Sequence, residues 1–563
     1  MRRAGRTIRV HAGSVPAIER RVTEPRDTEA TETADPATSS ERPRRSGRLA
    51  RSTAFFSFAT GLSRIAGLVR EIVAASYFGV KGPMSAFTIA FQVPNLVRSL
   101  FADQAIQAAL VPIFTEDLEH GRAKQAFRLA STLIFLFALI LGALVGLFII
   151  VAPTVMHLFA PGFEGEIYDL TVALSRVLFP ILLLLGLSGL VVGVLNSYER
   201  FAVFALAPLA WNIVIVAVLV GLAPAFPEED QIYAYAIGVV AGTVVQLAIL
   251  CWDLRNTPFK LQFEFDWRSP RVRRVLLLML PVTISLGLIN VNLVINSLVG
   301  TLVSDRAPAA IDKAFRIYML PQGMFSVALT TVIFPTLSRF AARQAYDDLR
   351  STMANGMRQI VLLLLPATAA ILVLSEPMVE LIYQRGEFDA SQTELVATAL
   401  FWFAFSLPFN GLFLLLTRTF FSLQRPWVPT AIAALNLVIT AGVAFAMYEP
   451  FGVGGIVAAT AIATAASVAA QAVVLRRMLG GLEIPKLIFS TIRIAIASLA
   501  LAGVTYGVWD VLHELLGGGL GGQIASVGGA LAAGGAVYLG ALALLRVPEL
   551  EQILRLARRR DPG

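Results

Sequence analysis

Four arginines lie within stretches of sequence that are otherwise apolar. Arg64 and Arg70 belong to SRIAGLVRE at 63–71, Arg98 ends PNLVR at 94–98, and Arg316 lies in KAFRIYMLP at 313–321. The planar guanidinium group binds phosphate oxygens through two parallel hydrogen bonds, so these residues predict recognition of a phosphorylated anion. Within a membrane each would cost about 2.5–3.5 kcal/mol at the centre of a span, which disfavours a purely lipid-facing position.

Carboxylates in the same stretches offer a second explanation, because buried arginines can pair with them. These are Glu71, Asp103 and Asp312, while Lys313 adds a fifth cation. Five cations against three carboxylates leave a surplus of two positive charges. Arg316, near the end of its stretch, could also extend toward lipid headgroups. The surplus of positive charge favours the first explanation, an anionic ligand.

Gly67 lies between Arg64 and Arg70. The six-residue spacing puts these arginines about 120° apart around a regular helix. A break or bend at Gly67 would turn both toward one cavity, as interrupted helices do in many transporters. The hypothesis is therefore an interrupted first helix, and a straight helix would count against it.

The 563-residue chain is too apolar for a soluble protein. Hydrophobic residues make up 56% and charged residues 15%, with a mean hydropathy of +0.71, whereas soluble domains average about 25% charged residues. One cysteine and four scattered histidines give neither a disulfide nor a metal-ligand spacing. The sequence has no phosphate-binding loop and no hydrolase motif. We expect an all-α polytopic membrane protein that is not an enzyme, with no catalytic residue, metal or cofactor.

Fourteen stretches have the length and hydropathy needed to cross a bilayer, which takes about 17 residues or more. They are 54–78, 84–111, 129–152, 171–195, 203–224, 232–251, 275–300, 310–335, 359–375, 395–416, 428–447, 454–475, 487–510 and 523–545. Residues 1–51 are polar and rich in arginine. We expect them to form a disordered, basic cytoplasmic tail that is attracted to anionic lipid rather than to nucleic acid.

The loops between these stretches differ in charge. Counted with the amino terminus inside, the inside loops hold 19 Lys and Arg residues, and the outside loops hold only Lys81, Arg306 and Arg385. Loops rich in lysine and arginine stay on the cytoplasmic side. An even number of spans with both termini in the cytoplasm is the arrangement that this bias predicts.

Two segments of the chain resemble each other at an offset near 225 residues. The run from Pro180 to SYER at 197–200 corresponds to the run from Pro408 to SLQR at 422–425. Each copy contains six spans, so both copies enter the membrane from the same side, as parallel repeats of transporters do.

We therefore predict two six-helix lobes related by a pseudo-twofold axis, with a cavity between them. The segments that this repeat predicts are an amino-terminal lobe at 52–251, a carboxy-terminal lobe at 252–475, two extra helices at 476–545 and a basic cytoplasmic tail at 546–563.

The stretches SRIAGLVREIVAASYFG at 63–79 and FQVPNLVRSLFADQAIQAALVPIFTE at 91–116 resemble the first two helices of the MurJ (MviN) family of lipid II flippases. The similarity continues through LFAPGF at 158–163, LNSYERF at 195–201 and YQRGEF at 383–388, and it covers about residues 52–545. This family belongs to a wider superfamily of multidrug, oligosaccharidyl-lipid and polysaccharide exporters with twelve to fourteen helices.

The resemblance implies a substrate and a mechanism. The substrate would be lipid II, the undecaprenyl-pyrophosphate-linked peptidoglycan precursor, carried to the outer leaflet by alternating access. The membrane potential or an ion gradient would drive it, in a bacterial plasma membrane. The family's cavity arginines correspond to Arg64, Arg70, Arg98 and Arg316, and Glu71 occupies an acidic position of the motif. Beside lipid II and the bilayer, the resemblance leaves room for cell-wall synthesis proteins as partners.

The family's charge pattern differs here in two places. A family aspartate that follows the first outer turn corresponds to Ser85, and acidic residues beside the eighth-helix arginine correspond to Phe315 and Met319. The resemblance therefore implies a more positive cavity and a different coupling route in this protein. The last two helices line a lipid-tail groove in the family, which implies the same role for 476–545.

Two other functions remain open on the sequence. A related exporter would carry another lipid-linked oligosaccharide or cationic drugs, although a drug exporter needs surplus carboxylates in its cavity. A non-transporting membrane scaffold for cell-wall synthesis would tolerate alanine at Arg64, Arg70 and Arg98.

Overall fold

The structure is a computed structural model that describes the backbone of residues 41–101, 104–200, 202–263 and 265–550. Side chains are described at the same positions except 41–57, 98–105, 107–108, 280–290 and 484. The chain divides into two units, Met1–Thr53 and Ala54–Gly563. Except for the start of α1, the helices described below belong to the second unit.

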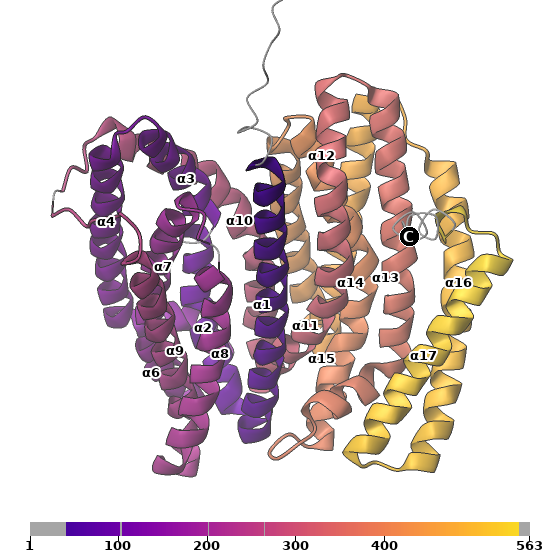
Figure 1. The fold of residues 1–563 in the computed structure, drawn as a ribbon. Coiled ribbons are helices and arrows are strands. Elements are labelled where there is room, and N and C mark those ends of the chain that lie inside the picture. The colour runs from indigo at the N-terminus through magenta and orange to yellow at the C-terminus, as the bar shows by residue number, and fades with distance from the viewer. Residues whose placement is uncertain (1–40, 102–103, 201, 264, 551–563) are drawn as a thin grey trace, which may run out of the picture. The chain divides into compact units, whose positions relative to one another are not determined.

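The described ranges are helical almost throughout and contain no strand (Figure 1). The helices are α1 (Glu41–Phe78), α2 (Gly82–Phe101), α3 (Gln104–Glu119), α4 (Ala123–Ile150), α5 (Ala152–Phe159), α6 (Gly165–Leu178), α7 (Pro180–Ser197), α8 (Ala202–Leu222), α9 (Gln231–Leu254), α10 (Pro270–Val303), α11 (Ala307–Pro321), α12 (Ala328–Ala342), α13 (Tyr346–Tyr383), α14 (Ala390–Ser422), α15 (Trp427–Leu479), α16 (Ile484–Leu516) and α17 (Leu520–Leu544). Short 3₁₀ helices η1 (Ala223–Ala225) and η2 (Glu228–Asp230) and a π-helical turn η3 (Gln322–Val327) complete the order.

Ten helical segments of the described residues are long and apolar enough to cross a membrane. The all-helical polytopic architecture is thereby confirmed, and the count of fourteen spans stays a prediction. One of the ten, α15, is 53 residues long and breaks at Gly452, which has φ +54°. The expected spans 428–447 and 454–475 lie on either side of this break, where Pro450 also removes a helical hydrogen bond.

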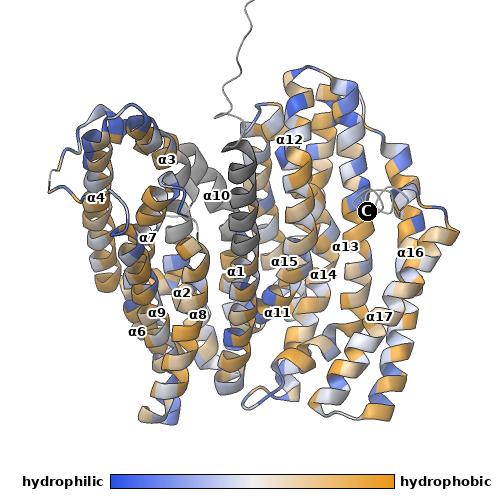
Figure 2. Cartoon of the chain, viewed as in Figure 1, coloured by the Kyte–Doolittle hydropathy of each residue, from blue (hydrophilic) through white to orange (hydrophobic). Residues whose placement is uncertain are grey.

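Hydrophobic residues run along most of the helices (Figure 2), and many large ones are exposed. Ile150, Val332 and Leu544 are examples that are at least 74% exposed. A soluble protein rarely leaves so many large apolar residues in water. Helices satisfy their own backbone hydrogen bonds, so such a surface is stable in lipid.

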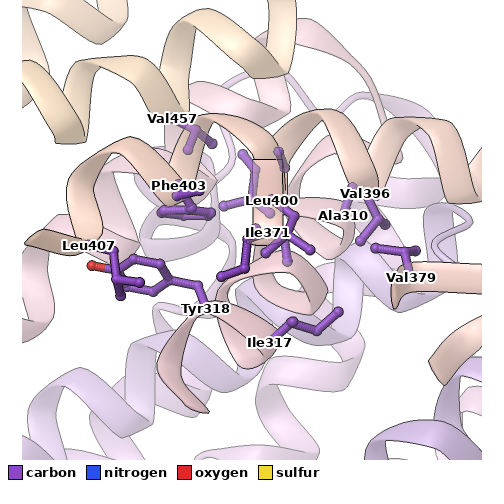
Figure 3. Packing of buried hydrophobic residues seen from close by; sticks show 14 of the residues in the cluster. Ala310, Ile317, Tyr318, Ile371, Val379, Val396, Leu400, Phe403, Leu407 and Val457 are labelled. Atoms are coloured by element: carbon purple, nitrogen blue, oxygen red, sulfur yellow. The ribbon is translucent and has the colours of Figure 1, made fainter. Parts of the chain in front are cut away.

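A buried cluster joins α11, α13, α14 and α15 (Figure 3). Tyr318 of α11 packs against Phe403 of α14 with ring centroids 5.3 Å apart. The Tyr318 hydroxyl lies 2.6 Å from Asn410 Nδ2 and accepts its hydrogen bond. Membrane helices lack a hydrophobic driving force between them, so close packing and interhelical hydrogen bonds of this kind hold them together. The cluster fixes the helix that carries Arg316.

The repeated motif has the same backbone geometry in both copies. Glu199 and Gln424, which correspond at the offset of 225 residues, both adopt a left-handed conformation, with φ of 57° and 56°. In each copy the next arginine donates its backbone N–H to a carbonyl five residues earlier, from Arg200 to Leu195 and from Arg425 to Phe420. This match supports the repeat, while the lobe boundaries stay a prediction.

Candidate functional site

The first span, α1, carries Arg64, Arg70 and Glu71. It is a continuous helix through Gly67, so the hypothesis of an interrupted first helix is wrong. A Cβ atom at Gly67 would lie 3.8 Å from the side-chain amide of Asn212 on α8, an ordinary van der Waals contact. The position therefore leaves room for a side chain, and a single glycine does not interrupt the helix.

Arg70 and Glu71 are both buried near the middle of the molecule, with exposed fractions of 8% and 5%. Arg70 Nη2 donates a 2.5 Å hydrogen bond to Glu71 Oε1. The Arg70 guanidinium also lies over the Trp211 ring of α8, 4.8 Å from its centroid. Trp211 is itself held by a 3.1 Å hydrogen bond from its Nε1 to Thr243 of α9. Arg70 is therefore oriented from two sides, by a carboxylate and by an aromatic face.

The eighth span brings three further charges to the same place. Lys313 of α11 donates a 2.6 Å hydrogen bond from Nζ to Glu71 Oε2. Arg316, half-buried, lies 3.9 Å from Glu71 Oε1 and 3.3 Å from Asp312 Oδ1. We call these residues the central charge network: Arg70, Glu71, Asp312, Lys313 and Arg316.

The central charge network has more positive than negative charge. Its three cations exceed its two carboxylates by one. Buried charges without a partner are costly, so the excess favours a site that is completed by an anion. The expected surplus of two also counted Arg64, which lies apart from the network, and Arg98 and Asp103, whose side chains lie outside the described residues.

A small cavity of about 50 Å³ adjoins the network. One water needs about 10–15 Å³, so the cavity holds a few waters and excludes a sugar pyrophosphate. The cavity beside Arg70 and Glu71 is therefore narrow in this conformation, while Arg316 remains partly exposed. The cavity is lined by Arg70, Glu71, Met84, Phe87, Thr88, Phe91, Gln92, Asn95, Trp211, Tyr235, Val239, Leu293, Asp312 and Arg316.

Arg64 does not belong to the central charge network. Its side chain is exposed, and its Nη1 atom would lie 3.7 Å from a Cβ atom placed on Gly323. Gly323 belongs to η3, so Arg64 faces the π-helical turn of the eighth span, two helical turns from Glu71. π-helical turns occur often at functional sites. Of the five predicted site residues, the structure brings together Arg70, Glu71 and Arg316.

Two residues of the network were not predicted as site residues. Lys313 was counted only as a cation, and Asp312 only as a pairing carboxylate. A lysine within an apolar span is itself a signal of function. The sequence could not show that its partner is Glu71, which lies 242 residues away.

Contacts between distant segments close the structure on one side of the network. We call this side the Lys81 face: it holds the turn 79–82 between α1 and α2, and the loop 384–389 between α13 and α14. Val80 donates its backbone N–H to Gln392 Oε1 at 2.6 Å, and Lys81 Nζ forms a 2.5 Å ion pair with Glu387. Glu387 N–H donates to the Ser76 carbonyl at 2.9 Å.

The start of α14 positions Gln392 for this contact. Asp389 caps the helix and accepts hydrogen bonds from the Ser391 hydroxyl and the Gln392 N–H, which lower the pKa of its carboxyl group. An ionised carboxylate at a helix amino terminus also interacts favourably with the helix dipole. The Lys81 face is thus built on a fixed helix end.

Ser85, which the sequence comparison above sets against an expected aspartate, joins distant segments of the structure. Its hydroxyl, fully buried on α2, accepts a 3.1 Å hydrogen bond from the backbone N–H of Ala309 in the first turn of α11. The first amides of a helix have no partner in the helix itself. Ser85 therefore caps α11 from another helix.

Removal of the Ser85 hydroxyl should weaken this cap. We expect Ser85→Ala to lower the stability of the folded protein by about 1 kcal/mol, the usual cost of losing a cap. Thermal unfolding of purified protein in detergent measures the change. Ser351→Ala, which removes an exposed hydroxyl bonded within α13, is the matched control and should unfold at the temperature of the unmodified protein. Equal unfolding temperatures for all three proteins would contradict the role of Ser85.

The comparisons with known proteins assign the chain to a family. The model of the family described as lipid II flippase MurJ matches residues 74–519. A "Probable lipid II flippase MurJ" of Rhizobium meliloti is 30% identical over 407 residues, covering 71% of this chain and 76% of that protein. The chain belongs to the lipid II flippase MurJ family.

Other MurJ relatives extend the match. The lipid II flippase MurJ of Burkholderia cenocepacia is 30% identical over 389 residues, which is 68% of this chain and 75% of that protein. A solved structure of lipid II flippase MurJ in an inward closed conformation has a TM-score of 0.74 at 23% identity, with coverage of 87% of this chain and 98% of that chain.

A structure of an inward-facing multidrug resistance transporter of the MATE family and MOP superfamily shares the fold more distantly. Its TM-score is 0.63 at 14% identity, over 74% of this chain and 94% of that chain. Helical spans and family membership together make the chain a multi-pass membrane transporter.

Proposed function

We propose that this protein moves lipid II from the cytoplasmic to the outer leaflet by alternating access. The observation that carries this proposal is the excess of cations in the central charge network at the junction of α1 and α11. Lipid II carries a pyrophosphate, and arginine binds phosphate oxygens bidentately. The wide, apolar surface of the helices lets the polyprenyl tail remain in lipid.

Loop charge gives the direction of transport. The turn 79–82 and the loop 384–389 belong to the loops predicted to lie outside, which together hold three Lys and Arg residues against 19 in the inside loops. We therefore assign the Lys81 face to the outer side and both termini to the cytoplasm. Contacts from Lys81, Val80 and Ser85 close the outer side. Toward the amino terminus of α1, Leu62, Arg64 and Ile65 are exposed, in contrast to the buried Arg70 and Glu71. The headgroup enters from this cytoplasmic side, where Arg64 is the first cation within the predicted span 54–78.

The pyrophosphate then binds to Arg70 and Arg316 once the two lobes separate enough to admit it. Arg98 lies on α2 beyond the described side chains, and we include it with Arg64 as a further contact. Closure of the cytoplasmic side and opening of the Lys81 face releases the headgroup outside. The protein exchanges between a state open to the cytoplasm and a state open at the Lys81 face. Substrate binding shifts this equilibrium only by the difference between its affinities for the two states. The membrane potential or an ion gradient supplies the net driving force.

The hairpin of α16 and α17 extends the path for the lipid tail. α16 presents an exposed apolar row at intervals of three to four residues, which is one face of a helix. The row consists of Ile488, Ile492, Ile496 and Leu499. We assign the polyprenyl tail to this region of the protein.

Complementation tests the proposed function. A bacterium whose own lipid II flippase is switched off should survive when it produces this protein, and lipid II should reappear on its outer leaflet. An enzyme added outside the cells, which cleaves only exposed lipid II, measures that pool. The same cells with an empty vector are the control. Cells that make the protein in the membrane yet accumulate lipid II inside would contradict the proposal and favour another lipid-linked oligosaccharide as substrate.

A further inference from the structure

Lys313 has a position that contact with substrate does not explain. It is fully buried, while Arg316, three residues later on the same helix, reaches the cavity. The Lys313 ammonium lies 2.6 Å from Glu71 Oε2 and 5.7 Å from the centre of the Tyr383 ring. Tyr383 also donates a 3.4 Å hydrogen bond from its hydroxyl to the Lys313 carbonyl. Lys313 is thus held behind Glu71, away from any ligand in the cavity.

The two oxygens of Glu71 have different partners. Oε2 accepts from Lys313, whereas Oε1 accepts from Arg70 and lies 3.9 Å from Arg316. The lysine therefore compensates the charge of Glu71 from the side opposite the arginines. Without it, Arg70 and Arg316 would be the remaining cations next to Glu71 and Asp312, and the network would have no excess charge.

We propose that Lys313 is a positioning residue that neutralises Glu71 from behind, so that Arg70 and Arg316 keep their positive charge for the pyrophosphate. This inference rests on the proposed function, because it assumes a pyrophosphate ligand. It adds a residue to the site that acts through Glu71 and touches no substrate. Lys313 belongs to α11 and Glu71 to α1, so the neutralisation of Glu71 depends on contact between these two helices.

The charge count gives variants with opposite outcomes. Lys313→Met removes one positive charge and leaves the network neutral. Adding Glu71→Gln removes one negative charge and returns the excess to one. We expect Lys313→Met to weaken pyrophosphate binding about tenfold, the size of one charge-assisted hydrogen bond, and the double variant to recover most of the loss.

The pH dependence of binding distinguishes a loss of charge from a loss of packing, because a packing defect would not be repaired by acid. Protonation of Glu71 in Lys313→Met also returns the excess to one, so its binding defect should shrink as the pH falls. The groups that face Glu71 are Arg70, Lys313, Arg316, Asp312 and, from α9 and α13, Tyr235 and Tyr383. The two tyrosines are neutral over the acidic range, and the unmodified protein keeps Glu71 paired with Lys313. Neither it nor the double variant should gain affinity in acid.

The experiment uses the full chain in lipid nanodiscs and a short prenyl pyrophosphate as the probe, with the matching prenyl alcohol as control. Binding is measured between neutral and mildly acidic pH for the unmodified protein, Lys313→Met and Lys313→Met with Glu71→Gln. Thermal unfolding of each variant checks that it is folded. Weak binding by Lys313→Met that recovers in acid, together with recovery in the double variant, is the expected result.

Two results would overturn the inference while leaving the proposed function intact. One is unchanged affinity of a folded Lys313→Met protein, and the other is a loss that neither acid nor Glu71→Gln reverses. If the unmodified protein does not prefer the pyrophosphate to the alcohol, the proposed function itself fails.

Discussion

Arg70→Ala should abolish most of the outward movement of lipid II. In cells that depend on this protein, we expect lipid II on the outer leaflet to fall by about tenfold or more, because one strong, charge-assisted contact contributes about 1.5–3 kcal/mol. Arg70 lines the cavity and is oriented by Glu71 and by the Trp211 ring. The pool that an external lipid II-cleaving enzyme reaches provides the measurement.

A matched arginine tests whether the effect is specific. Arg339→Ala removes a guanidinium group of α12 that donates a hydrogen bond to Thr336 in the same helix, and it should leave transport unchanged. Arg316→Ala should resemble Arg70→Ala, since both residues line the cavity. Normal outer-leaflet lipid II in Arg70→Ala cells, at equal amounts of membrane protein, would mean that the network is structural and would favour a scaffold.

Locking the Lys81 face should stop transport reversibly. We expect the pair Lys81→Cys and Glu387→Cys, in a protein with Cys251→Ala, to lose transport after treatment with a short bifunctional thiol reagent that is cleaved by reduction. The two native side chains meet in a 2.5 Å ion pair and are about half exposed, so the reagent can reach both positions. Because this contact joins α1–α2 to α13–α14, a covalent link there prevents the outer side from opening.

A second cysteine pair controls for modification itself. Asp347→Cys and Arg350→Cys replace an exposed ion pair within one turn of α13, so the same reagent links a helix to itself. Transport should continue after this control variant is linked. Reduction of the reagent should restore transport in the variant with cysteines at Lys81 and Glu387. Full activity of the linked Lys81 and Glu387 pair would exclude opening at the Lys81 face and contradict alternating access.

The membrane fold and three members of the site could be predicted from sequence. Hydropathy and loop charge are properties of single segments, so they predict helical spans without any knowledge of packing. Arg70, Glu71 and Arg316 were likewise visible, because a charge within an apolar span is costly wherever its partner lies. These predictions needed only local sequence.

The remaining features depend on contacts between distant segments. The pairing of Lys313 with Glu71 and the hydrogen bond from Val80 to Gln392 each join residues more than 240 positions apart. No local pattern indicates such partners. The expected break at Gly67 is wrong because one glycine in a helix interior costs only about 1 kcal/mol, and α1 continues through it.

The most direct test of transport uses purified protein in lipid vesicles. Fluorescent lipid II is placed in both leaflets, and an impermeant enzyme added outside cleaves only the exposed molecules. With the protein and an imposed membrane potential, inside negative, we predict that nearly all lipid II becomes cleavable, while vesicles with Arg70→Ala protein stop at the outer-leaflet fraction. If vesicles with the unmodified protein also stop at that fraction, under either sign of potential and with ion gradients, the protein does not flip lipid II.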